Sequence, residues 1–353
     1  MFTPPFCPHR ACPGHAAPER RFCVRHGTYS PKCRAHPVQR FRCRTCRRTF
    51  SRQTFRVDYR DHRPDLNPRL FELLASGVGL RQSARTLGLS LRCTELKFRK
   101  LARHLRRLNL SLRRPLRGQA RFHFDELETY EEHRGARPLS VPLLVESESR
   151  YLVWCESAPI RPRGKMNEKR RMAVKRAEKR HGRRRDLSRR STARTLRRGA
   201  DLARGAPGVT LETDEKATYP RLARRAFGQG RLVHNRTNSR LVRATWNPLF
   251  AVNHEEAVMR DLMGRLRRES WLVSKKRRYL DLGLQLHMAY RNLVRKRFNH
   301  DEASPAELLG FAPRRLTPHE AISWRQEAGC RSVHPLSRRG TTIERWRART
   351  RAA

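Results

Sequence analysis

The chain has 353 residues, and its 81 Lys and Arg against 32 Asp and Glu give a formal charge of +49. So large a positive excess repels itself unless a polyanion neutralises it, and DNA or RNA is the usual polyanion. Hydrophobic residues make up 37% of the chain, a share that argues against a ribosomal or nucleic-acid-coating protein and suits two or three folded domains.

The sequence contains no membrane or export signal. No stretch reaches the ~20 apolar residues that a membrane span requires, and the N-terminus lacks the basic-then-apolar order of a signal peptide. We therefore expect a cytoplasmic protein. In a reducing compartment its nine cysteines are expected to be thiols or metal ligands rather than disulfides.

The first sixty residues predict a zinc-binding unit. They contain six of the nine cysteines, including the pairs Cys7-x4-Cys12 and Cys43-x2-Cys46. Two thiolates a few residues apart supply half of a tetrahedral zinc site, so two such pairs complete one. We predict a zinc ribbon over residues 1–60, with Zn²⁺ held by these four cysteines. Reduced thiols without metal are the alternative, and other side chains are candidates to replace a ligand or build a second site: Cys23, Cys33, His9, His15 and His26.

Residues 66–110 are predicted to form a helix-turn-helix DNA-binding domain. Leucines recur there at three- and four-residue steps, the period of an amphipathic helix. Gly77 and Gly79 end the first helix, and a turn ending in Ser90 separates the next two. Any small three-helix bundle shows this pattern, but the basic composition favours DNA binding. Four side chains are predicted to reach a major groove: Arg92, Thr94, Lys97 and Arg99.

Residues 119–160 are predicted to form a three-stranded meander. The runs Ala120–Phe124, Ser140–Glu146 and Tyr151–Cys155 are rich in apolar, β-branched or aromatic residues. From 161 to about 198, nearly every second residue is Lys or Arg and hardly any residue is apolar. We expect that stretch to be a solvated helical or disordered insertion unless phosphates order it.

A second group of elements follows this basic stretch. We predict a strand at Val209–Asp214, a helix at Tyr219–Phe227, a strand at Arg231–Asn235 and then a long helical tract. Three strands, a connection, a fourth strand and helices match the order of an RNase H-like α/β core. The chain is therefore predicted to be a multi-domain α/β protein, with this core at 119–300 and a basic C-terminal tail at 301–353.

Two of the predicted strands end on a carboxylate. Asp125 follows the run Phe122-His123-Phe124, and Asp214 ends the run that begins at Val209. In an RNase H-like core the first and fourth strands are neighbours, which would bring the two aspartates together. Acids at two adjacent strand ends in a very basic chain predict metal-dependent chemistry on a nucleic acid.

These parts and their order resemble a bacterial insertion-sequence transposase of the DDE class. The string Arg265-Leu266-Arg267-Arg268-Glu269-Ser270-Trp271-Leu272-Val273-Ser274-Lys275-Lys276 is similar to the Arg-Leu-x-Arg-x-Ser-x-x-x-Ser-Lys segment of the insertion-sequence-one group. The resemblance covers residues 5–300. It implies a nucleoid-associated enzyme that cleaves and joins double-stranded DNA at element ends and target, acting as a homodimer or higher multimer.

The resemblance also implies a site for two Mg²⁺ or Mn²⁺ ions, held by Asp125 and Asp214. The position of the family's third acid falls on Asn253, and an amide coordinates metal more weakly than a carboxylate. Two nearby acids are the alternative third ligands: Glu255 and Glu256. Two further residues match basic positions of the family that are implied to contact DNA: Arg260 and Lys275.

Functions of other classes stay open at this stage. A regulator derived from an inactive transposase would bind DNA through the same N-terminal parts but would not cleave it. An RNase H-like nuclease would cut without strand transfer. Trp246 and Trp271 are expected to pack in the core, although aromatic rings of this kind can also stack on a flipped base.

Overall fold

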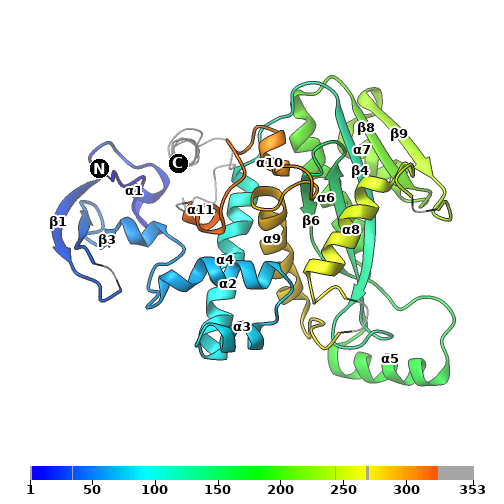
Figure 1. The fold of residues 1–353 in the computed structure, drawn as a ribbon, viewed down its shortest axis with the longest axis horizontal. Helices are drawn as coiled ribbons and strands as arrows, with labels where there is room; N and C mark the ends of the chain where they lie inside the picture. The colour runs from blue at the N-terminus through cyan, green and yellow to red at the C-terminus, as the bar shows by residue number, and fades with distance from the viewer. Residues whose placement is uncertain (1, 34, 243, 268–269, 325–353) are drawn as a thin grey trace.

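The computed structural model describes residues 2–33, 35–242, 244–267 and 270–324. It is a mixed α/β structure with two sheets (Figure 1). A three-stranded sheet belongs to the N-terminal residues, and a six-stranded mixed sheet belongs to the larger part of the chain. Among the described helices, none combines the length and the apolar character needed to cross a bilayer.

The N-terminal unit has a small core of aromatic rings and thiols. β1 (Cys23–Tyr29) pairs with β2 (Val38–Cys43), and β2 pairs with β3 (Thr49–Ser51), in both cases antiparallel. A short helix, α1 (Pro13–Ala16), precedes the strands. The core is separate from that of the rest of the chain and consists of buried phenylalanine rings packed against cysteines. A core of this size is marginal without a metal or another crosslink.

Three helices follow, separated where the glycines and Ser90 predict. α2 (Asn67–Ala75) ends before Gly77, whose φ of +82° is a conformation that glycine adopts without strain. α3 (Leu80–Thr86) and α4 (Leu91–Ser111) come next. The Ser90 hydroxyl caps α4 by accepting a hydrogen bond from the backbone N–H three residues later, at 3.2 Å.

α4 packs along α9 (Arg277–Leu293), so the three helices share their core with the sheet. One hydrophobic core contains buried side chains of α2, α4, α9 and the six-stranded sheet. At the contact, the Asn109 side chain on α4 donates to the backbone oxygen of Gln285 on α9 at 3.0 Å. The predicted boundary between 66–110 and 119–300 is therefore a change of element type within one packed body.

The six-stranded sheet has the strand order β6-β5-β4-β8-β9, with β7 paired to β5. β5 is antiparallel to β4 and β6, whereas β8 is parallel to β4 and β9 is parallel to β8. The prediction that the first and fourth strands are neighbours is confirmed, because these are β4 and β8. The strand bounds are Ala120–Tyr130 for β4, Pro138–Glu146 for β5, Leu152–Cys155 for β6, Ala158–Pro159 for β7, Val209–Asp214 for β8 and Leu232–Thr237 for β9.

β4 is longer than the predicted strand Ala120–Phe124. Its pairing with β5 continues through Asp125 as far as Tyr130, whereas its parallel pairing with β8 ends where Phe124 lies opposite Thr213. The prediction that Asp125 ends a strand is therefore wrong, because the charged residues after it conceal the continuing β pattern. Asp125 instead lies at the point of β4 where the neighbouring β8 stops.

Helices cover both faces of this sheet (Figure 1). α6 (Ser188–Leu202) and α7 (Tyr219–Phe227) pack on one face, and α8 (Phe250–Leu262) packs on the other together with one side of α9. Along β5, Leu144 packs with the first group and Leu143 with the second, as the alternation of a strand requires. The helix predicted at 219–227 is confirmed with the same bounds.

The basic stretch 161–198 divides into two different parts. α5 (Glu168–His181) has no buried residue, as expected for a solvated insertion. α6, in contrast, buries residues such as Thr195 and Gly199 against the sheet, so the prediction of an unburied insertion is wrong beyond about residue 187. The buried face of α6 is made largely of Ser, Thr and Gly, which allow a close approach. A Cβ atom on Gly199 would collide with the Leu144 side chain.

The predicted basic tail at 301–353 begins with folded residues. α10 (Pro305–Leu308) and α11 (Pro318–Ser323) both start with a capping box. Phe311 and Ile322 join the main hydrophobic core. This part of the tail prediction is wrong because a few apolar residues spaced between two capped turns are enough to fix the segment on α9 and α2. The remainder of the predicted tail, 325–353, lies outside the described residues.

Candidate active site and metal centre

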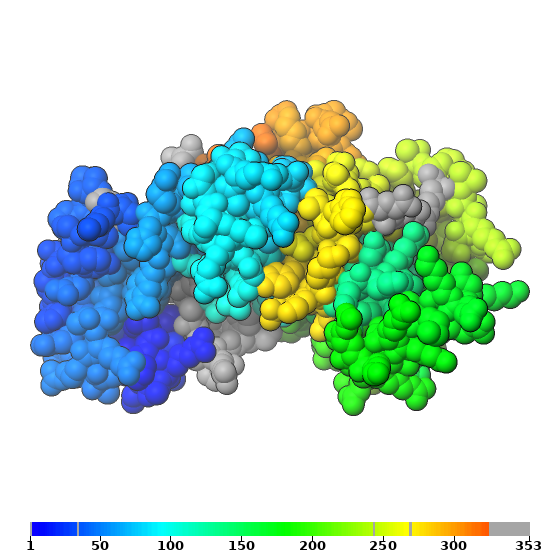
Figure 2. All heavy atoms as spheres, turned by 90° about the horizontal axis from the view of Figure 1, so that it is seen from below, coloured from blue at the N-terminus to red at the C-terminus, as the bar shows by residue number. Residues whose placement is uncertain are grey.

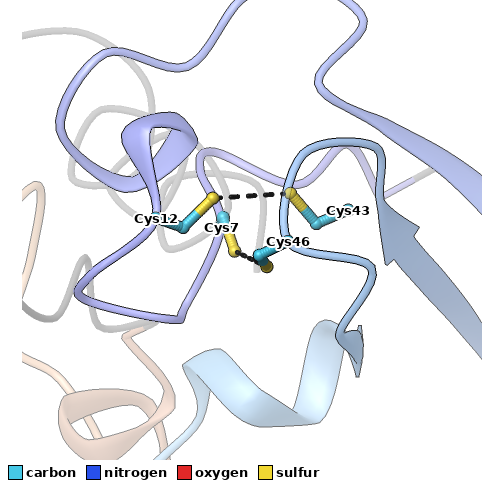
Figure 3. A group of neighbouring side chains, drawn as sticks. All are labelled: Cys7, Cys12, Cys43 and Cys46. Carbon is cyan, nitrogen blue, oxygen red and sulfur yellow. Dashed lines mark hydrogen bonds between the residues drawn. The ribbon is translucent and has the colours of Figure 1, made fainter.

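Four thiols meet at one point of the N-terminal unit (Figure 3). The Sγ atoms of Cys7 and Cys46 are 3.6 Å apart, those of Cys12 and Cys43 are 3.7 Å apart, and all four lie within 4.8 Å of one another. Tetrahedral zinc with Zn–S bonds of about 2.3 Å places its sulfurs about 3.8 Å apart. The predicted ligand set is brought together, and it could hold a metal ion such as zinc.

The other proposed ligands do not join this cluster within the described part of the chain. Cys23 is half-buried and Cys33 is exposed, and a ring nitrogen of His15 lies 2.6 Å from the backbone oxygen of Cys7. Burial raises the pKa of Cys7. Burial also raises the pKa of Cys43, but hydrogen bonds from the backbone of residues 46 and 45 outweigh it and lower that pKa to about 7. Part of the cluster is therefore prepared to act as a thiolate ligand.

Replacing Cys43 and Cys46 together by Ser is expected to remove about one zinc ion per chain, because half of the tetrahedral site is lost. The ribbon should unfold with it, since metal binding supplies much of the folding free energy of so small a unit. Elemental analysis and circular dichroism of the purified full chain measure both effects. Cys33→Ser is the matched control, because this thiol is exposed and outside the cluster. Full zinc retention by the double variant would contradict the assignment.

Asp125 and Asp214 face one cleft at the edge of the β4–β8 pair. Asp214 is the last residue of β8, and Asp125 follows the last residue of β4 that pairs with β8. Both line a cleft of about 380 Å³. Two aspartates separated by almost ninety residues in sequence thus reach the same opening, because the parallel pairing places equivalent positions of the two strands side by side.

α8 contributes one of its faces to the same cleft. Asn253, Glu256 and Arg260 all line it, and their spacing of three and four residues places them on one side of the helix. Asn253 is half-buried, and Glu256 is 7% exposed. The face turned toward the sheet is apolar and includes Val252 and Met259. The predicted third position and one of its two alternatives are therefore both present at the cleft.

Glu255 points the other way. Its side chain is completely buried, its Oε2 accepts a hydrogen bond from Arg291 at 2.9 Å, and its Oε1 lies 3.6 Å from a ring nitrogen of His287. Burial raises the pKa of Glu255, but the positive charge of Arg291 and the His287 contact outweigh it and bring that pKa to about 2. The alternative of Glu255 as a third metal ligand is thus wrong, because its carboxylate is committed to an ion pair between α8 and α9.

The candidate metal ligands at the cleft are oxygen atoms of two aspartates, a glutamate and an amide, the set that hard divalent cations prefer. Glu126 and Glu128 line the same cleft. Among the described residues, the four thiols are the only group of three or more Cys, His, Asp or Glu ligands close enough to hold a metal ion, and the acids of the cleft do not form such a group. Three cationic side chains line the same cleft: Arg163, Lys216 and Arg260. The cleft therefore combines acids for a cation with bases for an anion.

No known protein-family model matches this chain, and no curated protein matches it either. The chemistry of the cleft is therefore the ground for assigning a function. Its main features are the aspartates of two adjacent parallel strands, the polar face of α8 and the neighbouring positive charges.

The predicted groove-reading residues of α4 are placed less favourably than expected. Thr94 is completely buried. Lys97 is buried as well, and its ammonium donates to Asp61 at 3.2 Å and to Asn67 at 2.9 Å. The prediction that these two side chains reach a groove is wrong, because they fall on the stripe of α4 that also carries the core residues.

Two of the four residues predicted on α4 keep a solvent-facing position. Arg92 is exposed, whereas Arg99 is half-buried and donates to the Tyr279 hydroxyl at 2.7 Å. On α3, Arg81 and Arg85 are exposed and were not predicted. The signal for them was available, since both lie opposite the apolar residues of that short helix.

Lys275 is exposed, and its contact with DNA stays a prediction. The expectation of core packing for Trp246 and Trp271 is wrong, since their side chains are 64% and 98% exposed. Trp246 follows cleft-lining residues of the segment between β9 and α8. Isolated tryptophans in a polar segment have no periodic pattern, so the sequence alone does not show which side of the chain they take.

Proposed function

We propose that this chain is a DNA transposase of the DDE class, which uses divalent metal ions to cleave and join phosphodiester bonds. The observation that carries the proposal is the meeting of Asp125 and Asp214 at one cleft with the polar face of α8. The strand order β6-β5-β4-β8-β9, with β8 and β9 parallel to β4, supports an RNase H-like core. The basic composition supports a nucleic acid as substrate.

In this proposal the carboxylates of Asp125, Asp214 and Glu256 hold the metal ions, with the Asn253 amide as a weaker ligand one turn earlier on α8. Bound there, Mg²⁺ or Mn²⁺ ions would activate water or a 3′-hydroxyl and stabilise the leaving 3′-oxygen. The three carboxylates would hold the ions beside the phosphate that is cut. Arg260 lies on the same face of α8 and is proposed to bind the DNA backbone.

DNA is proposed to contact the N-terminal unit, α3 and the start of α4, and the segment that carries α5. Residues 161–187 contain thirteen Lys and Arg against three acids, and α5 has no buried residue. This segment forms the green lobe at the lower right of Figure 2, beside the yellow residues that lead from α8. Exposed positive charge without apolar burial suits contact with phosphates rather than with another protein core.

The proposal is tested by incubating the full chain with linear DNA that carries the ends of its own element, in Mg²⁺ and in EDTA. We expect Mg²⁺-dependent nicks that leave 3′-hydroxyls at the element boundary, followed by joining to a target duplex. Binding of the ends without any nick would favour the DNA-binding regulator, for which the amide at residue 253 is the motivating feature. Nicks without joined product would favour a nuclease.

Neutralising the exposed lysines of α5 is expected to flatten the salt dependence of DNA binding. Lys169, Lys175 and Lys179 are all exposed, and each phosphate contact contributes about 0.9 to the slope of log affinity against log salt. Changing all three to Gln should therefore reduce that slope by as much as about 2.7, as measured by fluorescence anisotropy. The matched control changes the same three residues to Arg, which keeps the charge. An unchanged slope in the Gln variant would show that α5 faces away from DNA.

A further inference from the structure

Lys216 is a cation fixed within the cleft of acids. It follows Asp214 by two residues, lines the cleft and is about one-third exposed. Its backbone N–H donates to the Asp214 carboxylate at 3.1 Å, and its ammonium donates to Glu126 Oε1 at 2.8 Å. The backbone of Lys216 is thus bonded to the candidate ligand Asp214. Its ammonium is bonded to Glu126, which follows the candidate ligand Asp125 in sequence.

Glu126 is itself held rigidly. It follows Asp125 on β4, and its side chain is 9% exposed. Its carboxylate accepts hydrogen bonds from the Ser140 hydroxyl of β5 at 2.7 Å and from the Thr192 hydroxyl of α6 at 2.9 Å. These contacts and the Lys216 ammonium hold the carboxylate in place.

An aromatic ring limits the remaining freedom of the lysine. The Lys216 ammonium lies 5.2 Å from the ring centroid of Tyr219, which is buried. A cation at this distance is attracted by the ring face. The buried ring therefore helps to hold the ammonium in position.

The ammonium has bonding capacity to spare. An ammonium carries three donors, and Glu126 is its one polar partner among the described residues. The carboxylates of the cleft repel a phosphate that enters it. A partly exposed cation with free donors offsets this repulsion by giving the phosphate a charge-assisted hydrogen bond.

We propose that Lys216 binds a non-bridging oxygen of the DNA phosphate that is cut, and that Glu126 is the positioning residue that holds Lys216 for this contact. The identity of that phosphate rests on the proposed function. The contact itself is a charge-assisted hydrogen bond, so no covalent step is assigned to either residue.

The test measures binding of the full chain to a panel of element-end duplexes in Ca²⁺, which slows cleavage. Each duplex carries one uncharged methylphosphonate in place of one phosphate. Lys216→Met is expected to weaken binding of natural DNA about tenfold. The same substitution should not change binding of the duplex whose methylphosphonate replaces the phosphate at the cut position. Lys216→Arg should keep most of the affinity, and Lys169→Met on exposed α5 is the matched control, with no such dependence on that duplex.

The role of Glu126 is tested by combining its substitution with Lys216→Met. The coupling is the dependence of the Lys216→Met effect on a second change, either in Glu126 or in one phosphate of the DNA. In a Glu126→Gln chain, the additional effect of Lys216→Met on natural DNA should fall to about twofold or less, while thermal melting reports whether the fold is retained. A structural salt bridge alone would change melting and leave the methylphosphonate panel flat, and that outcome would overturn the proposal. Coupling at a phosphate other than the cut one would also overturn it. Coupling at one phosphate in a chain that cuts no DNA would uphold the contact and overturn the proposed function.

Discussion

Replacing Asp125 or Asp214 by Asn is expected to lower Mg²⁺-dependent DNA cleavage by more than about a hundredfold. Residues that only support a metal ligand already cost about 10- to 100-fold when they are changed, and each aspartate is proposed to be a ligand itself. The substitution keeps the shape of the side chain and removes its negative charge. Binding of element ends should therefore stay within about twofold of the unchanged chain, as measured by anisotropy in EDTA at fixed salt.

Glu215→Gln is the matched control for this experiment. Glu215 directly follows Asp214 but is exposed and does not line the cleft. Its change should leave the cleavage rate within about twofold, since a surface charge contributes little. Strong cleavage by the Asp125→Asn chain would remove the catalytic proposal, and the DNA-binding regulator would then be the better assignment.

The adjacent residues Glu255 and Glu256 are expected to respond in opposite ways. Glu256→Gln should abolish cleavage, because Glu256 lines the cleft. Glu255→Gln should instead lower the free energy of unfolding by about 3–5 kcal/mol, because it leaves Arg291 buried without its charge partner. Asn253→Ala should reduce cleavage less than Glu256→Gln, since an amide is the weaker ligand. Cleavage kinetics and denaturant unfolding separate the two effects.

The ion pair of Glu255 also predicts how stability depends on pH. The pKa of Glu255 is about 2 in the folded chain, below its ordinary value of 4.5. Its contribution is therefore complete above about pH 4.5 and is lost as the pH falls toward 2. The Glu255→Gln chain should lack this part of the acid dependence.

Loss of cleavage in Asn253→Ala together with normal cleavage in Glu256→Gln would reverse the assignment of the third ligand.

Local patterns predicted most of the elements that carry the candidate site. The helix at 219–227 and the strand that ends on Asp214 were predicted with their final bounds, because the strand alternates buried and half-buried residues and the helix repeats apolar residues at three- and four-residue steps. The spacing of the thiols predicted the four cysteines that meet in Figure 3. Asp125 was identified although the end of its strand was misplaced, since acids that follow a β run look the same whether or not pairing continues.

Contacts between distant segments decided the remaining features. α6 is buried through Ser, Thr and Gly, whose value in a close approach depends on the strand beneath them. Lys97 looks in the sequence like any other basic residue on a helix. Its burial depends on the hydrogen bonds that its ammonium donates to Asp61 and Asn67. These partners lie more than twenty residues away in sequence, so no local pattern contains them.

The sequence by itself determined that this chain is a basic protein of α/β pattern, with two pairs of closely spaced thiols and two aspartates that follow or end β-like runs. Composition, ligand spacing and the period of apolar residues are local properties, and they suffice for those conclusions. The tertiary structure alone decided that Glu256 faces the cleft while Glu255 pairs with Arg291, and that Glu126 holds Lys216. One residue of helix turns a side chain by about 100°, so only the packing of α8 between the sheet and α9 decides which carboxylate reaches the site.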